Sequence, residues 1–173
     1  WIDCMLKQVK KDDVTLSLGA NIGYYTIFLA EAVGKNGKVF AVEPEKKNVD
    51  LLEKNVIANN LKNVEVIQKA ISDKNGKVKF QISKMSGDHT MVKDNDSNNT
   101  IEVDAISIDE YFKEICSSIS FVIFTIEGAE LKALKGMSET IKQSKNLIII
   151  AEFYPEKIRS LGDSPKEFLE LLT

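Results

Sequence analysis

The chain has 173 residues, of which 43% are hydrophobic and 28% are charged, and its formal net charge is −3. This composition is ordinary for a globular α/β domain, and the weakly acidic balance gives no attraction to nucleic acid or to an anionic membrane. No apolar run approaches the roughly 20 residues that cross a bilayer. We therefore expect one cytoplasmic domain over residues 1–173, with its core at about 13–153 and no nucleic-acid or membrane partner.

The first predicted strand, residues 14–18, leads through the turn G-A-N-I-G into an apolar helix at 24–33. Glycine permits positive φ angles and lets a ligand approach the backbone closely. The start of the helix adds free N–H groups and a positive dipole end. Such a turn is typical of nucleotide-like cofactor sites, although a plain turn that needs glycine only for its geometry has the same pattern.

The second predicted strand, residues 38–42, ends at Glu43 and Pro44, and a helix is expected over 45–59. Residues 64–67 predict a third strand. Asn75-Gly76 then separates QKAISD from KVKFQIS, which indicates a hairpin between these two segments. Residues 83–99 are polar and aperiodic, so we expect a mobile loop there.

The second half of the chain continues the alternation of strands and helices. Strands are expected at 100–106, 120–125 and 147–151, the last of them central in the sheet because it is the most apolar. Helices are expected over 107–115, from Glu127 through Ile141, and after Ser164; both Ser107 and Ser164 begin capping-box patterns. The alternation predicts an α/β fold with a doubly wound, mostly parallel sheet and helices on both faces. The chain begins with Trp and stops inside an apolar helical pattern, so we expect N-terminal structure and some C-terminal strands to be missing.

Glu43 lies 20 residues after Gly23, at the end of the second predicted strand. A carboxylate at this place can accept hydrogen bonds from both hydroxyls of a ribose, and the alternative is a solvated acid at a strand end. The turn has two glycines rather than the three of G-x-G-x-x-G, and Tyr24 and Tyr25 follow it. A compact amino-acid tail fits this turn better than a pyrophosphate, which favours S-adenosylmethionine over NAD as the cofactor.

A set of motifs in order along residues 13–153 resembles the FkbM family of S-adenosylmethionine-dependent methyltransferases. The motifs are L-G-A-N-I-G-Y-Y-T, V-F-A-V-E-P, N-x-x-x-N-N-L, A-I-S-D and I-E-G-A-E-L-K-A-L-K-G-M. The resemblance implies a class I methyltransferase fold and methyl transfer to a hydroxyl of a sugar or other small natural product. It also implies a cofactor-binding set of Ser17, Gly19, Asn21, Gly23, Glu43, Pro44, Ala70 and Ile71, with the glycine turn at the methionine end, Glu43 at the ribose and Ala70 and Ile71 at the adenine.

Two positions depart from the family pattern. The family has D-V-G-A-N where this chain has Ser17 in S-L-G-A-N, and K-I-D-V-E-G where this chain has Thr125 in I-F-T-I-E-G. Both missing acids would lie near the methionine portion or the methyl group of the cofactor. The chain is therefore interpreted as a methyltransferase, with a catalytically impaired binding protein of the same fold as the alternative and an NAD-linked oxidoreductase as a weaker one.

Four residues are candidates for catalysis: Glu127, Thr125, His89 and Glu152. Glu127 and Thr125 come from the motif with the missing acid, and a position at the start of a helix suits Glu127 to anchoring or to simple capping. His89 is a candidate because the unperturbed pKa of histidine, about 6.5, suits a general base, but a lone histidine in a polar loop is more often solvated. Glu152 follows the strand at 147–151. No metal site is expected, and Cys4 and Cys116 are interpreted as reduced thiols.

Overall fold

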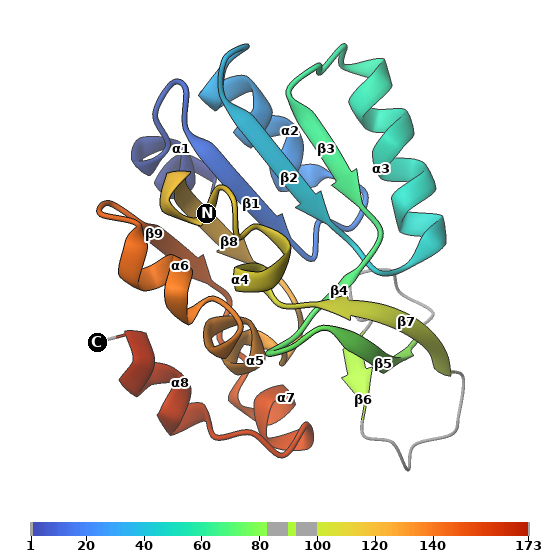
Figure 1. Ribbon diagram of the computed structural model, residues 1–173. Coiled ribbons are helices and arrows are strands. Elements are labelled where there is room, and N and C mark those ends of the chain that lie inside the picture. Colours follow the sequence, from blue (N-terminus) through green and yellow to red (C-terminus); the bar gives the residue numbers. More distant parts are fainter. Residues whose placement is uncertain (1, 83–89, 93–99, 173) are drawn as a thin grey trace.

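The computed structural model describes residues 2–82, 90–92 and 100–172. Its main sheet has five parallel strands in the order β3-β2-β1-β8-β9 (Figure 1). The strands are β1 (Val14–Leu18), β2 (Lys38–Val42), β3 (Val64–Ile67), β8 (Ile119–Phe124) and β9 (Ile148–Ala151). β9 lies at the edge of this sheet, so its expected central place is wrong; β1 and β8 occupy the centre.

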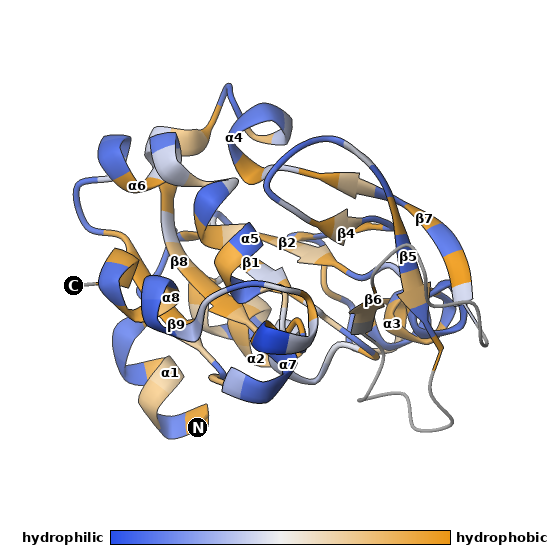
Figure 2. Ribbon diagram, turned by 90° about the horizontal axis from the view of Figure 1, so that it is seen from below, coloured by the Kyte–Doolittle hydropathy of each residue, from blue (hydrophilic) through white to orange (hydrophobic). Residues whose placement is uncertain are grey.

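Helices cover both faces of the main sheet, as expected for a doubly wound fold. Alternate residues of β2 show the division: Val39 packs with α1 (Ile2–Gln8) and α2 (Tyr24–Val33), whereas Phe40 and Val42 pack on the opposite side. That opposite side holds α4 (Ile108–Tyr111), α5 (Glu130–Lys135), α7 (Pro155–Ser160) and α8 (Pro165–Leu172). The apolar strands β8 and β9 lie between these layers (Figure 2), where burial of their side chains stabilises the sheet.

A second, four-stranded sheet has the order β4-β7-β5-β6. Its strands are β4 (Ala70–Ile71), β5 (Gly76–Gln81), β6 (Thr90–Val92) and β7 (Thr100–Ile106). The hairpin expected around Asn75-Gly76 is wrong, because β4 and β5 both pair with β7, which lies between them. The Asn75 side chain instead accepts a hydrogen bond from the backbone N–H of Ser107 at 2.9 Å.

Four other local expectations differ from the structure. β6 lies inside the expected loop 83–99, and His89 falls outside the described residues. The helix expected from Glu127 begins at Glu130 and is interrupted at Gly136, so that α6 (Ser138–Gln143) is separate. A Cβ atom at Gly136 would lie 2.3 Å from the carbonyl oxygen of Ser72, which shows how closely the two segments pack. The helix after Ser107 is shorter than predicted, and α7 was not predicted.

The remaining long helix, α3 (Lys46–Ala58), packs on the same side of the main sheet as α2. Glu45 caps its N-terminus by accepting a hydrogen bond from the backbone N–H of Asn48 at 2.7 Å. Among the described residues, no helix is long and apolar enough to cross a membrane.

Candidate functional site

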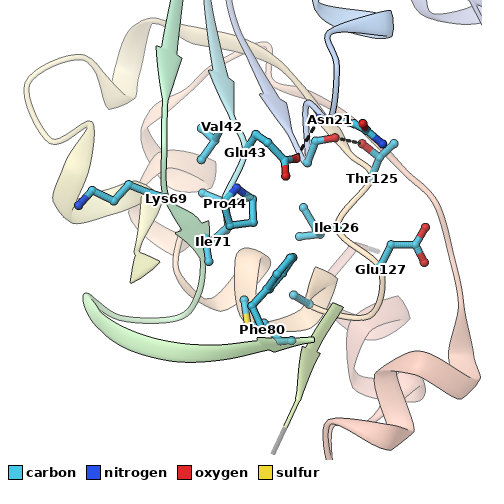
Figure 3. Close-up of a pocket in the computed structure, with 14 residues that line it drawn as sticks. Asn21, Val42, Glu43, Pro44, Lys69, Ile71, Phe80, Thr125, Ile126 and Glu127 are labelled. Carbon is cyan, nitrogen blue, oxygen red and sulfur yellow. Dashed lines mark hydrogen bonds between the residues drawn. The ribbon is translucent and has the colours of Figure 1, made fainter. Parts of the chain in front are cut away.

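Two adjoining cavities lie beyond the carboxyl ends of the parallel strands. The strand order reverses between β1 and β8, and open α/β sheets bind ligands at such a point. The inner cavity has about 480 Å³ of empty space, part of it open to solvent. Its walls include Gly19, Asn21, Val42, Glu43, Pro44, Lys69, Ala70, Ile71, Phe80, Met91, Thr125, Ile126, Glu127 and Ala129 (Figure 3).

Glu43 follows β2 and faces the inner cavity, yet only 4% of it is exposed. Its Oε2 accepts a hydrogen bond from the backbone N–H of Asn21 at 2.9 Å. Its Oε1 accepts from the backbone N–H of Glu45 at 3.0 Å and from the side-chain amide of Asn48 at 3.2 Å. Burial raises the pKa of Glu43, and these three hydrogen bonds partly oppose that rise. A carboxylate can accept about four hydrogen bonds, so this one retains capacity for a ligand hydroxyl.

The glycines of the turn after β1 are required by packing of the protein on itself. Gly19 has φ +77°, and a Cβ atom there would lie 2.1 Å from the carbonyl oxygen of Thr125. Gly23, at φ +97°, lies before α2, and a Cβ atom there would be 2.6 Å from Cδ1 of Leu52 in α3. These glycines therefore allow the turn to pack closely against the end of β8 and against α3. Gly19 and Asn21 still line the inner cavity.

The second sheet gives the inner cavity an apolar wall. Ala70 and Ile71 of β4 lie there, together with Phe80 of β5 and Met91 of β6. Sequence reasoning missed Phe80 and Met91, although the alternation in K-V-K-F-Q marks Phe80 as an inward residue of a strand. An aromatic ring and a thioether form a surface suited to a flat heteroaromatic group.

The second cavity, here called the tyrosine cavity, has about 950 Å³ of empty space, including open solvent. Three tyrosines line it: Tyr24 and Tyr25 from α2 and Tyr154 after β9. Glu127 and Glu152 add carboxylates, and Glu127 forms an ion pair with Lys157 of α7. Burial and the neighbouring charge of Glu127 raise the pKa of Glu152, while burial and the charge of Glu152 raise the pKa of Tyr25. Phe153, in contrast, stacks on Phe168 of α8.

The two residues that depart from the family pattern are held by the protein itself. Ser17 is 1% exposed, and its hydroxyl accepts a hydrogen bond from that of Thr26 at 3.2 Å. The Thr125 hydroxyl donates to the carbonyl oxygens of Leu18 and Gly19, both at 3.0 Å. Thr125 lines both cavities, but its hydroxyl proton is already used in these two hydrogen bonds. Ser17 lines neither cavity.

Glu127 does not begin a helix as the sequence suggested. It lies in a loop where both Glu127 (φ +52°) and Gly128 (φ +103°) have left-handed backbone angles. The fully buried Glu130 supports this loop, because its Oε1 accepts a hydrogen bond from the N–H of Gly128 at 3.1 Å. In the described part of the chain no group of three or more His, Cys, Asp or Glu side chains could hold a metal ion.

Comparison with solved structures shows the fold. A methyltransferase FkbM from Methylobacillus flagellatus KT has a TM-score of 0.63 at 19% identity; the match covers 95% of this chain but only 38% of that one. A putative rRNA methylase from Clostridium thermocellum has a TM-score of 0.59 at 20% identity, and the match covers 98% of this chain and 76% of that one. A putative methyltransferase from Streptococcus mutans, in complex with SAH, has a TM-score of 0.56 at 14% identity, and the match covers 99% of this chain and 77% of that one.

No curated protein matches this sequence. The methyltransferase FkbM domain, however, matches residues 17–173, which is most of the chain. The α/β architecture, the strand order and the place of the two cavities agree with that match. This protein therefore belongs to the FkbM methyltransferase family.

Proposed function

We propose that this protein is an S-adenosylmethionine-dependent methyltransferase that methylates a hydroxyl group of a sugar or another small natural product. The observation that carries the proposal is the buried Glu43 carboxylate, which faces the inner cavity at the end of β2 with acceptor capacity to spare. A ribose there would leave the adenine against Ile71, Phe80 and Met91. The family match and the neighbour in complex with SAH support this cofactor.

The cofactor, when bound, supplies a methyl group on a positively charged sulfonium, which is already a good leaving group. The residues of this chain then have to bind the cofactor and the acceptor, orient them toward each other and exclude water. Glu43 holds the sugar, Gly19 and Asn21 line both cavities, and the tyrosine cavity accommodates the acceptor. The free thiols Cys4 and Cys116 agree with the cytoplasmic location that we include in the proposal.

Calorimetric titration tests the cofactor assignment. We expect S-adenosylhomocysteine to bind with one site per chain and NAD to give no heat of binding. Transfer of a tritiated methyl group from S-adenosylmethionine to hydroxylated small molecules then tests the reaction. Binding of NAD alone, or of neither compound, would refute the proposal.

A binding protein without catalysis is the second candidate, because the hydroxyls of Ser17 and Thr125 are both committed inside the protein. Tight binding of S-adenosylhomocysteine, together with no methyl transfer to any member of a broad set of sugars and polyols, would favour this candidate over the enzyme.

A further inference from the structure

The inner cavity and the tyrosine cavity adjoin each other. Gly19, Asn21, Thr125 and Glu127 line both of them. In Figure 3 the Glu127 carboxylate points away from Phe80 and Ile126. A cofactor whose adenosine lies in the inner cavity, as the proposed function requires, would direct its amino-acid tail along these shared residues toward the tyrosine cavity.

Glu152 lines the tyrosine cavity, and within the described residues its side chain accepts no hydrogen bond and forms no ion pair. Glu43 accepts three hydrogen bonds, Glu130 accepts one from Gly128, and Glu127 forms its ion pair with Lys157. No described residue donates a hydrogen bond to the Glu152 side chain, which is half-buried beside Glu127. The charge of Lys157 acts on Glu152 as well as on Glu127, so two carboxylates against one lysine leave a net charge of −1 at this wall, which favours binding of a cation.

The tyrosines make the same wall suitable for a cation. Ring faces attract positive charge, and the structure uses this already, since Nζ of Lys157 lies 5.2 Å from the centre of the Tyr154 ring. Ser17 and Thr125 carry no charge to offer a ligand, and their hydroxyls are committed. We propose that Glu152 binds the α-ammonium group of the cofactor's amino-acid tail in the tyrosine cavity, in place of an acid at position 17 or 125.

This inference rests on the proposed function, and the test separates the two. The probes are S-adenosylhomocysteine and its deaminated analogue, 5′-S-(3-carboxypropyl)-5′-thioadenosine, which keeps the tail carboxylate but has no ammonium group. Calorimetry gives the Kd of each probe for the wild type, for Glu152→Gln and for Glu156→Gln. Glu156 is a matched control, because it is an exposed carboxylate four residues away that does not line the cavity.

We expect Glu152→Gln to raise the Kd of S-adenosylhomocysteine about tenfold, the usual scale for one charged hydrogen bond. The Kd of the deaminated analogue should change less than twofold, and Glu156→Gln should change neither. If Glu152→Gln weakens the binding of both probes equally, or of neither, the inference is overturned while the cofactor assignment stands. If Glu152→Gln does not fold, the wild type decides: equal affinity for the two probes overturns the inference. Binding of neither probe to the wild type would refute the proposed function itself.

Discussion

At the scale of single residues, Glu43 determines the shape of the inner cavity before any ligand is present. Its two oxygens accept hydrogen bonds from the turn after β1 and from the start of the segment that leads into α3. The carboxylate thus joins two loops at the strand ends as well as facing the cavity. A substitution there should therefore affect both stability and ligand binding.

We predict that Glu43→Gln lowers the free energy of unfolding by about 1–3 kcal/mol, because the new amide NH₂ group faces backbone N–H donors that lose their acceptor. Affinity for S-adenosylhomocysteine should fall about tenfold, since the ribose loses a charged acceptor. Urea denaturation and calorimetry measure the two effects. Glu53→Gln, an exposed change in α3, is the control and should alter neither. A variant with normal affinity would exclude Glu43 from the binding site.

Thr125 gives a second prediction at this scale. Its hydroxyl donates to two backbone carbonyls, which ties the end of β8 to the turn after β1. Thr125→Val should cost about 1 kcal/mol of stability, the usual value of a neutral hydrogen bond. Thr125→Asp, which restores the family residue, places a carboxylate near the same carbonyl oxygens and should cost more. Denaturation midpoints compare the three proteins, and a stabilised aspartate variant would contradict this explanation.

At the scale of elements, sequence periodicity predicted the segments whose structure is local. The bounds of β1, α2, β2 and β3 match the expected ranges, because alternation, glycine and proline mark their ends. The pairing of β4 and β5 with β7 could not be predicted in this way, since the paired residues are 19 to 35 positions apart and the Asn-Gly signal carries no information about them. The break before α6 likewise comes from a tertiary contact at Gly136.

The same division applies to the candidate site. Glu43, Ala70 and Ile71, three of the predicted cofactor-binding residues, line the inner cavity. Glu43 does so because the carboxyl ends of parallel strands meet at one edge of the main sheet. Phe80 and Met91 were missed, since the local alternation marks an inward residue but does not reveal where β5 and β6 pack. The ion pair between Lys157 and Glu127 was beyond prediction for the same reason, because it depends on where α7 packs.

The packing of α7 on the Glu127 loop can be tested through Gly128. A Cβ atom at Gly128 would lie 2.9 Å from backbone atoms of Lys157, and the residue has φ +103°. Gly128→Ala should therefore cost at least about 2 kcal/mol more than Gly76→Ala, whose Cβ would meet nothing within 4 Å. Urea denaturation measures both variants. Equal costs would show that α7 does not press on this loop.

The buried Glu130 beneath that loop predicts a pH dependence. Burial raises its pKa above the ordinary value of 4.5, so the folded state retains a proton that the unfolded chain has released. Retention of this proton adds to the free energy of unfolding below pH 4.5, and this contribution is lost as the pH rises through the raised pKa. The free energy of unfolding should fall by at most about 1.4 kcal/mol per pH unit in that range. Glu130→Gln should remove this slope. Denaturation series at several pH values compare the two proteins, and parallel curves would contradict the assignment.

At the scale of the whole molecule, the inner cavity lies where the two sheets meet. Gly19 and Glu43 belong to the ends of the main sheet, whereas Phe80 and Met91 belong to the second sheet. A ligand that contacts both walls binds only when the sheets are correctly placed. Binding should therefore stabilise the two sheets together, and not just the loops that touch the ligand.

Amide hydrogen exchange tests this coupling. With S-adenosylhomocysteine at 100 times its Kd, amides that exchange through opening of the cavity should slow about 100-fold, in β5 and β6 as well as in β1 and β2. Amides of α6 that exchange by local fraying should keep their rates, which makes this helix the internal control. Protection confined to β1 and β2 would mean that the ligand contacts the main sheet alone, and the apolar wall formed by Phe80 and Met91 would then have no part in binding.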